Sequence, residues 1–295
     1  LSLMRSSWAN YSPLLCLFRD GRDAAVATLL WQIARRDPDM EANPPDQPGI
    51  RAWCVTDPAT LGALRGALTD SQIYIADGHH RYEAAVAFRD YTRDELGHGP
   101  DTASQFRLTH LIAIDDPGLF LLGYHRGISG ATREEIISLR RHIGAVCDLQ
   151  EWTPPPSEVG SAMELRLARA PKGRMTFGVA GFEDGKFHIA TMKNGAAPEA
   201  GLADSTDYGR LHQEIFNGIF GPTRELHAVN VKNSADQAVK EVVLGQSQMG
   251  FVMRAVPLGI AESVITQEEL LPVKSTYFHP KPSAGIVIQS LEGDL

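Results

Sequence analysis

A short apolar run that stops at an Asp-Gly pair and passes directly into a long helix-forming segment is the feature that most limits the folds open to this chain. The run Ile73-Tyr74-Ile75-Ala76 has the length and composition of a buried strand. After Asp77-Gly78, a stretch that begins at His79 or His80 and ends near Leu96 contains several alanines, which favour a helix. A strand that turns through a glycine into a helix is typical of layered α/β proteins.

The same alternation of strand-like and helix-like segments continues along the 295 residues and predicts an α/β to α+β fold with a mixed sheet. Asp57-Pro58 is typical of a helix start, and Thr132 with Glu135 has the spacing of a capping box. We also expect Asp23 to cap a helix through Ile33, Asp207 to cap a helix to Phe220, and residues 284–288 to form a closing strand.

A proline-rich stretch, Trp152-Thr153-Pro154-Pro155-Pro156, is the best linker candidate. Consecutive prolines stiffen the chain and interrupt strand pairing. We therefore predict an α/β region over residues 1–151, which carries the Asp-Gly turn, and a second α+β region over residues 152–295.

Charge and composition exclude several classes of protein. The chain has 28 Lys and Arg against 36 Asp and Glu, a net charge of −8, which opposes a general surface for nucleic acid or anionic membranes. Cys16, Cys54 and Cys147 are far apart and are expected to be reduced, buried thiols. No apolar run approaches the roughly 18 residues of a membrane helix, and no signal peptide is visible. We expect a cytoplasmic protein without a nucleic-acid or membrane partner.

Residues Asp77 to Arg81 combine groups that bind anions. Unpaired N–H groups and the helix dipole attract phosphate to a helix start, and Gly78 lets it approach the backbone closely. Arg81 can bind phosphate oxygens through two donors, while His79 and His80 can donate hydrogen bonds or transfer a proton near neutral pH. Asp77 can hold a magnesium ion or orient a hydroxyl nucleophile. The alternative is that Asp77 is only an N-cap and that the histidines are surface residues.

The sequence DGHHR at residues 77–81, followed by a helix of small residues, resembles the phosphate-binding motif of the ParB/sulfiredoxin superfamily. In that superfamily a Gly-x-(His/Arg)-Arg turn at a helix start binds nucleotide phosphates. One branch, the free-serine kinases, carries DGHHR itself, and other branches are CTP-binding partition proteins and ATP-using sulfiredoxins. The resemblance implies a nucleotide ligand.

A second resemblance spans most of the chain. ADGHHRYEAA at residues 76–85, LHQEIF at residues 211–216 and KSTYFHPK at residues 274–281 are together similar to the domain of unknown function 1015 family. Members are usually longer at the front, so we expect this chain to lack an N-terminal segment. The resemblance implies that a catalytic group carried there, such as the glutamate of the serine kinases, is missing or supplied otherwise. Members tend to have Pro-Thr-His-Arg where this chain has Gly123-Tyr124-His125-Arg126. The His and Arg are therefore kept, but in a changed context.

The segment at residues 274–281 is a second chemical cluster, expected to fold back onto the first region and complete a nucleotide pocket. The alternative is an ordered polar loop with solvated lysines. Its candidate phosphate-binding residues are Lys274, Ser275, Thr276, His279 and Lys281. Weaker candidates are Glu83, His125, Arg126 and His212. For His212 the favoured interpretation is a buried, hydrogen-bonded helix histidine.

These features predict nucleotide-dependent phosphoryl transfer to a small hydroxyl metabolite, with ATP or ADP and magnesium as cofactors. The resemblance to the serine kinases implies free serine as the acceptor and a place in serine metabolism. Positioning and electrostatics suffice for such chemistry, so no Walker motif is required. The alternative is a ParB-like nucleotide-binding switch or binding module without metabolite chemistry. The sequence leaves open whether the chain is an enzyme, which nucleotide and acceptor it takes, and its oligomeric state.

Overall fold

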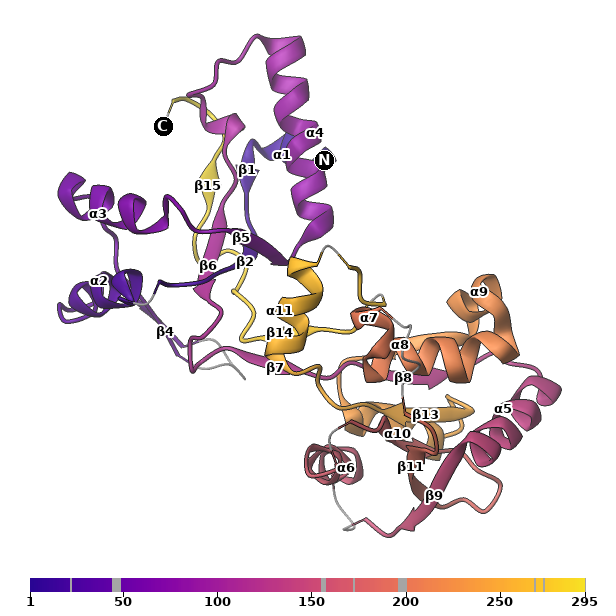
Figure 1. Ribbon diagram of the computed structural model, residues 1–295. Helices are drawn as coiled ribbons and strands as arrows, with labels where there is room; N and C mark the ends of the chain where they lie inside the picture. The colour runs from indigo at the N-terminus through magenta and orange to yellow at the C-terminus, as the bar shows by residue number, and fades with distance from the viewer. Residues whose placement is uncertain are drawn as a thin grey trace. The chain divides into compact units, whose positions relative to one another are not determined.

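The computed structural model describes residues 1–21, 23–43, 49–154, 158–171, 173–195, 201–267, 269–272 and 274–294 (Figure 1). The chain forms two compact units. Unit 1 consists of Leu1–Phe120 together with Pro280–Leu295, and unit 2 consists of Leu121–His279.

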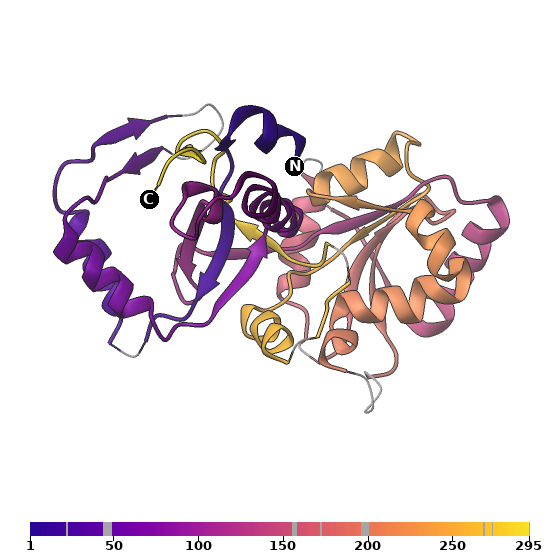
Figure 2. The ribbon, with the colours of Figure 1, turned by 90° about the horizontal axis from the view of Figure 1, so that it is seen from above.

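Unit 1 is built on a three-stranded mixed sheet in the order β5 (Ile73–Asp77), β2 (Leu14–Phe18), β6 (Thr109–Ala113). The central strand β2 is entirely buried. It runs antiparallel to β5 and parallel to β6. The long helix α4 (His79–Leu96) follows β5 and is seen almost along its axis in Figure 2. Its Phe88 is fully buried, and the Phe88 ring meets the Trp8 ring edge-on at a centroid distance of 5.4 Å.

Shorter elements surround this sheet. The helix α3 (Pro58–Leu68) begins at Asp57-Pro58 as expected, and Asp57 caps it, because its carboxylate accepts a hydrogen bond from Thr60 N at 2.8 Å. Asp23 does not cap α2; the carboxylate of Asp20 accepts from Val26 N and Ala27 N instead. The short elements of unit 1 are α1 (Ser2–Ser7), β1 (Ala9–Asn10), α2 (Ala25–Ile33), β3 (Met40–Ala42), β4 (Ile50–Ala52), α3 (Pro58–Leu68), a 3₁₀ turn (Ala103–Gln105) and β15 (Gln289–Ser290).

The closing strand lies later than predicted. Residues 284–288 are not a strand, because Gly285 adopts a positive φ of 78° and turns the chain. Only Gln289–Ser290 pairs, as β15, antiparallel to β1. Leu291 after it is fully buried, so the end of the described chain still contributes to the core of unit 1.

Unit 2 contains a six-stranded antiparallel sheet. Its order is β12 (Val229–Lys232), β8 (His125–Ile128), β13 (Met249–Val252), β10 (Thr176–Ala180), β11 (Phe187–Met192), β9 (Cys147–Trp152). One buried cluster joins the sheet to α5 (Arg133–Val146) and to the helical segment from α8 (Asp207–Arg210) to α9 (Asn217–Ala228). A second buried cluster joins it to α6 (Val159–Ala168) and α10 (Ala235–Val243). The remaining elements are α7 (Leu202–Ser205), α11 (Leu258–Thr266), and the strand pair β7 (Phe120–Leu122) with β14 (Tyr277–His279).

The division into units differs from the predicted one at residue 151. Strand β8 precedes that position and β9 crosses it, yet both belong to the same sheet as β10 to β13. Hydrogen bonding across this sheet therefore includes residues that lie before the proline-rich stretch. Trp152 is paired with Phe187 at the edge of the sheet, so that stretch begins inside unit 2. Pro155 and Pro156 lie outside the described residues.

The helical segment over residues 207–228 is interrupted. Thr206, not Asp207, is the N-cap of α8, since its hydroxyl accepts from Gly209 N at 3.1 Å. Residues Leu211–Phe216 form a π-helical turn, and Gly221 has a positive φ of 67° that kinks α9 just before Pro222. The predicted single helix is thus a series of shorter helical pieces.

Cys16 and Cys147 are buried as expected, whereas Cys54 is exposed, and all three are free thiols. Cys54 lies in the connection between β4 and α3, whereas Cys16 and Cys147 lie on strands. Within the described ranges, no helix is both long and apolar enough to cross a membrane.

The start of α5 provides a pH-dependent stability test. Glu135 closes the predicted capping box by accepting from Thr132 N at 2.6 Å, and it also pairs with Arg224 Nε at 3.0 Å. The hydrogen bond from Arg224, and then that from Thr132, lower the pKa of Glu135 to about 2. The stabilisation is therefore complete above the unfolded pKa of roughly 4.3 and is lost as the pH falls toward 2.

We expect Glu135→Gln to lower the free energy of unfolding by about 1 kcal/mol at pH 7, since the ion pair is partly exposed. The difference from wild type should shrink to near zero by about pH 2. Urea denaturation of both proteins at pH 7, 4 and 2.5 measures this. A difference that stays constant over that range would contradict the assignment.

Candidate functional site

The site begins where β5 ends and α4 starts. Gly78 is the residue before α4 and has φ 100°, a conformation that L side chains rarely adopt. Gly78, and not Asp77, is the N-cap, and no side chain caps this helix start, so the expected N-cap role of Asp77 is wrong, whereas the histidines are surface residues as that alternative has them. The first N–H groups of α4 have no partner within the helix and carry the positive end of its dipole.

Two cations converge on the carboxylate of Asp77. Arg81 Nη2 lies 2.7 Å from Asp77 Oδ2, and Lys281 Nζ lies 2.8 Å from Asp77 Oδ1. All three side chains are only about one-third exposed, at 35%, 28% and 36% for Arg81, Asp77 and Lys281. Because one carboxylate offsets only one of these two positive charges, the trio as a whole is cationic.

Arg81 is held in place over the turn. Its Nη1 donates to the carbonyl of Pro13, just before β2. A Cβ atom at residue 78 would lie 3.1 Å from the Cζ, Nε and Nη2 atoms of Arg81. Glycine at position 78 therefore allows both the positive φ of the turn and the close approach of the Arg81 guanidinium to the backbone.

The neighbouring polar residues of α4 face solvent. His79 and His80 are exposed. His80 Nδ1 lies 3.1 Å from Glu83 Oε2, and these side chains are 99% and 71% exposed. They border the helix start without being fixed by the rest of unit 1, which leaves them accessible to a ligand.

Among the described residues, the structure presents no preformed metal site. No group of three or more His, Cys, Asp or Glu side chains that could hold a metal ion occurs in the part of the chain that the structure describes. The Asp77 carboxylate, predicted to bind magnesium, is engaged by Arg81 and Lys281. A metal ion at Asp77 would require one of these cations to move.

The predicted residues 274–281 fall in both units. Lys281 belongs to unit 1, whereas Lys274 to His279 belong to unit 2. Lys274 has a positive φ of 58°, and its Nζ lies 5.7 Å from the centroid of the Tyr124 ring. Ser275 is buried and donates to Pro272 O at 2.6 Å, so its hydroxyl holds a turn. Thr276 is partly buried and His279 is exposed, and their role in binding stays a prediction.

The weaker candidates of unit 2 lie in its interior. His125 and Arg126 are each 1% exposed on β8. His125 Nδ1 accepts from Met253 N at 3.2 Å, which directs Nε2 to Glu164 at 3.4 Å. Burial, aided by the charge of Arg126, lowers the pKa of His125 to about 4, so this imidazole is neutral at pH 7.

His212 is hydrogen-bonded and lies on a helical turn as the favoured interpretation proposed, but it is partly buried and not fully buried. It lies in the π-helical turn, where its Nδ1 contacts Glu225 Oε1 and its Nε2 accepts from Arg126 Nε at 3.4 Å. The Arg126 guanidinium also lies 5.3 Å from the Tyr208 ring centroid. These contacts link a buried arginine to a carboxylate through an imidazole and stabilise the interior of unit 2.

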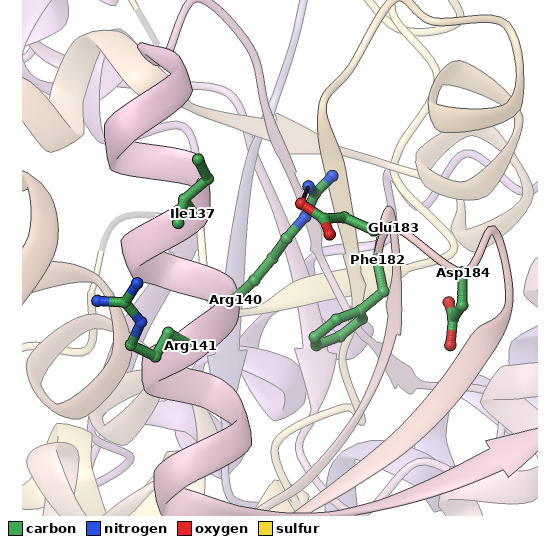
Figure 3. A pocket seen from close by; sticks show the side chains of 6 residues that line it. All are labelled: Ile137, Arg140, Arg141, Phe182, Glu183 and Asp184. Atoms are coloured by element: carbon green, nitrogen blue, oxygen red, sulfur yellow. Dashed lines mark hydrogen bonds and ion pairs between the residues drawn. The ribbon is translucent and has the colours of Figure 1, made fainter.

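A cavity of about 360 Å³ elsewhere in unit 2 contains none of the predicted residues (Figure 3). Arg140 in its wall lies 3.4 Å from Glu183, and Asp184 lies 3.3 Å from His188. Because none of the predicted site residues lines it, and both of its carboxylates are paired with cations or imidazole, we do not place the site there. Its lining residues are Ile137, Arg140, Arg141, Phe182, Glu183 and Asp184.

Sequence reasoning missed two contributors to the site in unit 1. The carbonyl of Pro13 orients Arg81, and Arg107 lies at the same end of the sheet, where its Nη2 donates to Ser12 O at 2.5 Å. No spacing in the sequence signals either role, because residues 13 and 107 reach the turn only through the pairing of β5, β2 and β6.

These features define an α/β protein with a cationic helix start that suits an anionic ligand. The family model described as "Protein of unknown function (DUF1015)" matches residues 1–218. The chain belongs to this family, which confirms the resemblance noted in the sequence.

Comparison with solved structures gives distant matches. A conserved hypothetical protein from Pyrococcus furiosus aligns with a TM-score of 0.42 and 13% identity, over 98% of this chain and 85% of that chain. A free serine kinase in complex with AMP aligns with a TM-score of 0.36 and 12% identity, over 90% and 83%. A mutant free serine kinase in complex with ADP aligns with a TM-score of 0.37 and 11% identity. None of the curated proteins matches the sequence significantly. At these scores the activity must be argued from this chain's own residues.

Proposed function

We propose that this protein catalyses nucleotide-dependent phosphoryl transfer to a small hydroxyl metabolite, with free serine as the first acceptor to test. The observation that carries the proposal is the convergence of Arg81 and Lys281 on Asp77 at the start of α4. Phosphoryl transfer depends chiefly on positioning and on cations that stabilise the charge of the transferred group. A helix start with two cations supplies both.

Each residue has a defined role in the proposal. Phosphate oxygens bind to the N–H groups of α4 and to the guanidinium of Arg81, which exchanges Asp77 for the phosphate. Lys281 neutralises charge that develops on the transferred group. Asp77, released from the two cations, orients the acceptor hydroxyl. The exposed His79 and His80 donate hydrogen bonds to the phosphates or carry a proton.

Magnesium has a place in this proposal only together with the nucleotide. Proteins usually bind Mg²⁺ through one or two carboxylates plus substrate phosphates. Asp77 is the carboxylate that fits this description once Arg81 and Lys281 bind phosphate oxygens. The ion would supply additional neutralisation of phosphate charge.

The test is a direct assay of transfer. Wild-type protein is incubated with ATP or ADP, with magnesium or with EDTA, and with serine and other hydroxyl metabolites, and phosphorylated products are detected by mass spectrometry. We expect a phosphorylated acceptor from wild type and a rate at least about tenfold lower from Asp77→Asn, the scale for loss of a positioned catalytic group. Asp94→Asn, which removes a carboxylate that pairs with Arg93 on α4, is the matched control and should leave the rate unchanged.

The alternative outcomes separate the function classes. Nucleotide binding without transfer to any acceptor would contradict the kinase proposal and support a nucleotide-binding switch. If the protein neither binds a nucleotide nor transfers a phosphoryl group, the prediction of a nucleotide ligand is contradicted as well. Equal activity of wild type and Asp77→Asn would place the chemistry elsewhere.

A further inference from the structure

Arg107 lies beside the candidate site and is not part of the predicted motif. The register pairs Leu15 with Asp77 and Leu14 with Thr109. The carboxyl end of β5 and the amino end of β6 are therefore at the same end of the sheet. Arg107, two residues before β6, lies at that end, on the opposite side of β2 from Asp77.

Arg107 and Arg81 bind to consecutive residues of one segment. Arg107 Nη2 donates to Ser12 O at 2.5 Å, and Arg81 Nη1 donates to the carbonyl of Pro13. The segment before β2 thus binds two guanidinium groups through consecutive carbonyls. Burial is the main cause that lowers the pKa of Arg107, and repulsion from the positive charge of Arg81 lowers it further.

Arg107 lacks an acidic partner in the described part of the chain. Its Nη1 donates to Asn10 Oδ1, which is a neutral amide, and its remaining donor, Nε, is buried without a hydrogen-bond partner. The cation is therefore half-buried next to another cation and is bound only by neutral acceptors. A buried charge of this kind is costly unless an anion compensates it.

We infer that Arg107 extends the site to a second phosphoryl group, so that the site selects nucleoside di- or triphosphates over monophosphates. This inference rests on the proposed function. The first phosphoryl group binds at the α4 start and Arg81. The next one lies toward Arg107, where its negative charge compensates the guanidinium that the protein leaves without a carboxylate. Arginine suits this role because its planar donors match phosphate oxygens.

The test compares ligands that differ by one phosphoryl group. Dissociation constants for ADP, AMP, pyrophosphate and orthophosphate are measured by calorimetry on wild type and on Arg107→Gln. We expect wild type to bind ADP more tightly than AMP. In Arg107→Gln the dissociation constant for ADP should rise by about tenfold or more, the scale of one charge-assisted contact, whereas that for AMP should rise by less than about threefold. Arg93→Gln, which removes an exposed arginine from the other end of α4, should leave all affinities unchanged.

A second variant covers the case in which Arg107→Gln fails to fold. Asn10→Asp keeps the acceptor for Arg107 and adds the missing carboxylate without changing the size of the side chain. The amide of Gln289, which now accepts from Asn10 Nδ2 at 2.9 Å, can turn to donate instead. The variant should unfold at the same temperature as wild type, and its dissociation constants for ADP and AMP should differ much less than those of wild type.

The outcomes distinguish this inference from the proposed function. An unchanged ADP-to-AMP preference in a folded variant, or equal losses for both ligands, would overturn the inference alone. Arg107-dependent binding of pyrophosphate without binding of any nucleotide would support the second phosphoryl site and overturn the proposed function. Wild-type protein that binds none of the four ligands would overturn both.

Discussion

Replacing Arg81 by alanine is expected to weaken nucleotide binding by about ten- to a hundredfold, the range that corresponds to loss of a charge-assisted hydrogen-bonding group. Arg81 lies in the first turn of α4 and binds both the Asp77 carboxylate and the Pro13 carbonyl. In the variant, Asp77 keeps Lys281 as its partner at 2.8 Å, and the site loses one of its two cations. The trio of Asp77, Arg81 and Lys281 then loses its excess positive charge, which weakens the attraction for a polyanion.

Calorimetric titration of ATP, ADP and CTP, each with magnesium, measures this effect. Arg93→Ala is the matched control, because it removes an arginine from the same helix that pairs with Asp90 and Asp94 in solvent. The control should bind like wild type. Arg81→Ala that binds every nucleotide as tightly as wild type would show that the phosphates bind elsewhere. The thermal unfolding of both variants checks that the fold is kept.

Replacing Gly160 by alanine is expected to destabilise unit 2 by about 3 kcal/mol or more, at the upper end of overpacking effects. Gly160 lies in the first turn of α6, where the helix meets the first turn of α10. A Cβ atom there would lie 2.1 Å from the carbonyl carbon of Ala235 and 2.2 Å from Asp236 N. Both are backbone atoms, so the two helices must separate to admit the methyl group.

The same separation would break a polar contact. Asp236 Oδ1 accepts from Gly160 N at 2.7 Å and from Ser161 N at 3.3 Å, and its other oxygen accepts from the Ser161 hydroxyl. The carboxylate from α10 thus satisfies N–H groups at the start of α6, as an N-cap would. Moving the helices apart leaves these groups without their acceptor, which adds to the steric cost.

Gly144→Ala is the matched control for this prediction. Gly144 is also a helix glycine of unit 2, but a Cβ atom there would meet nothing within 4 Å. Alanine should therefore stabilise the protein by about 0.5–1 kcal/mol through the lower backbone entropy of the unfolded chain. Chemical denaturation of the three proteins measures both effects. Gly160→Ala with wild-type stability would mean that α6 and α10 are not in contact at Gly160.

Short sequence patterns correctly predicted the strands and helices in which they occur. The apolar run at residues 73–76 became β5, and the alanine-rich stretch became α4. Asp57 and the pair Thr132 and Glu135 cap helices as their spacing predicted. Such signals act over three or four residues through hydrogen bonds to nearby N–H groups, so they do not depend on the rest of the fold.

Where two nearby side chains could each cap the same helix start, the sequence did not predict which of them forms the hydrogen bond. Asp20, and not Asp23, serves the start of α2, and Thr206, and not Asp207, serves α8. Asp207 instead pairs with Arg254 at 2.7 Å. A distant arginine therefore decided the role of Asp207, which local spacing cannot reveal.

The sequence by itself determined the chemical character of the candidate site, because Asp77, Gly78 and Arg81 are close in sequence and lie at one strand-to-helix turn. Only the tertiary structure decided which distant groups join them. Lys281 pairs with Asp77, from which it is separated by 204 positions in the sequence, and Arg107 binds Ser12, which is 95 positions away. The division of the chain into units was likewise decided by pairing of β8 and β9 with later strands. The physical reason is the same in each case: strand pairing joins segments that are far apart in sequence, and no local pattern specifies the partner.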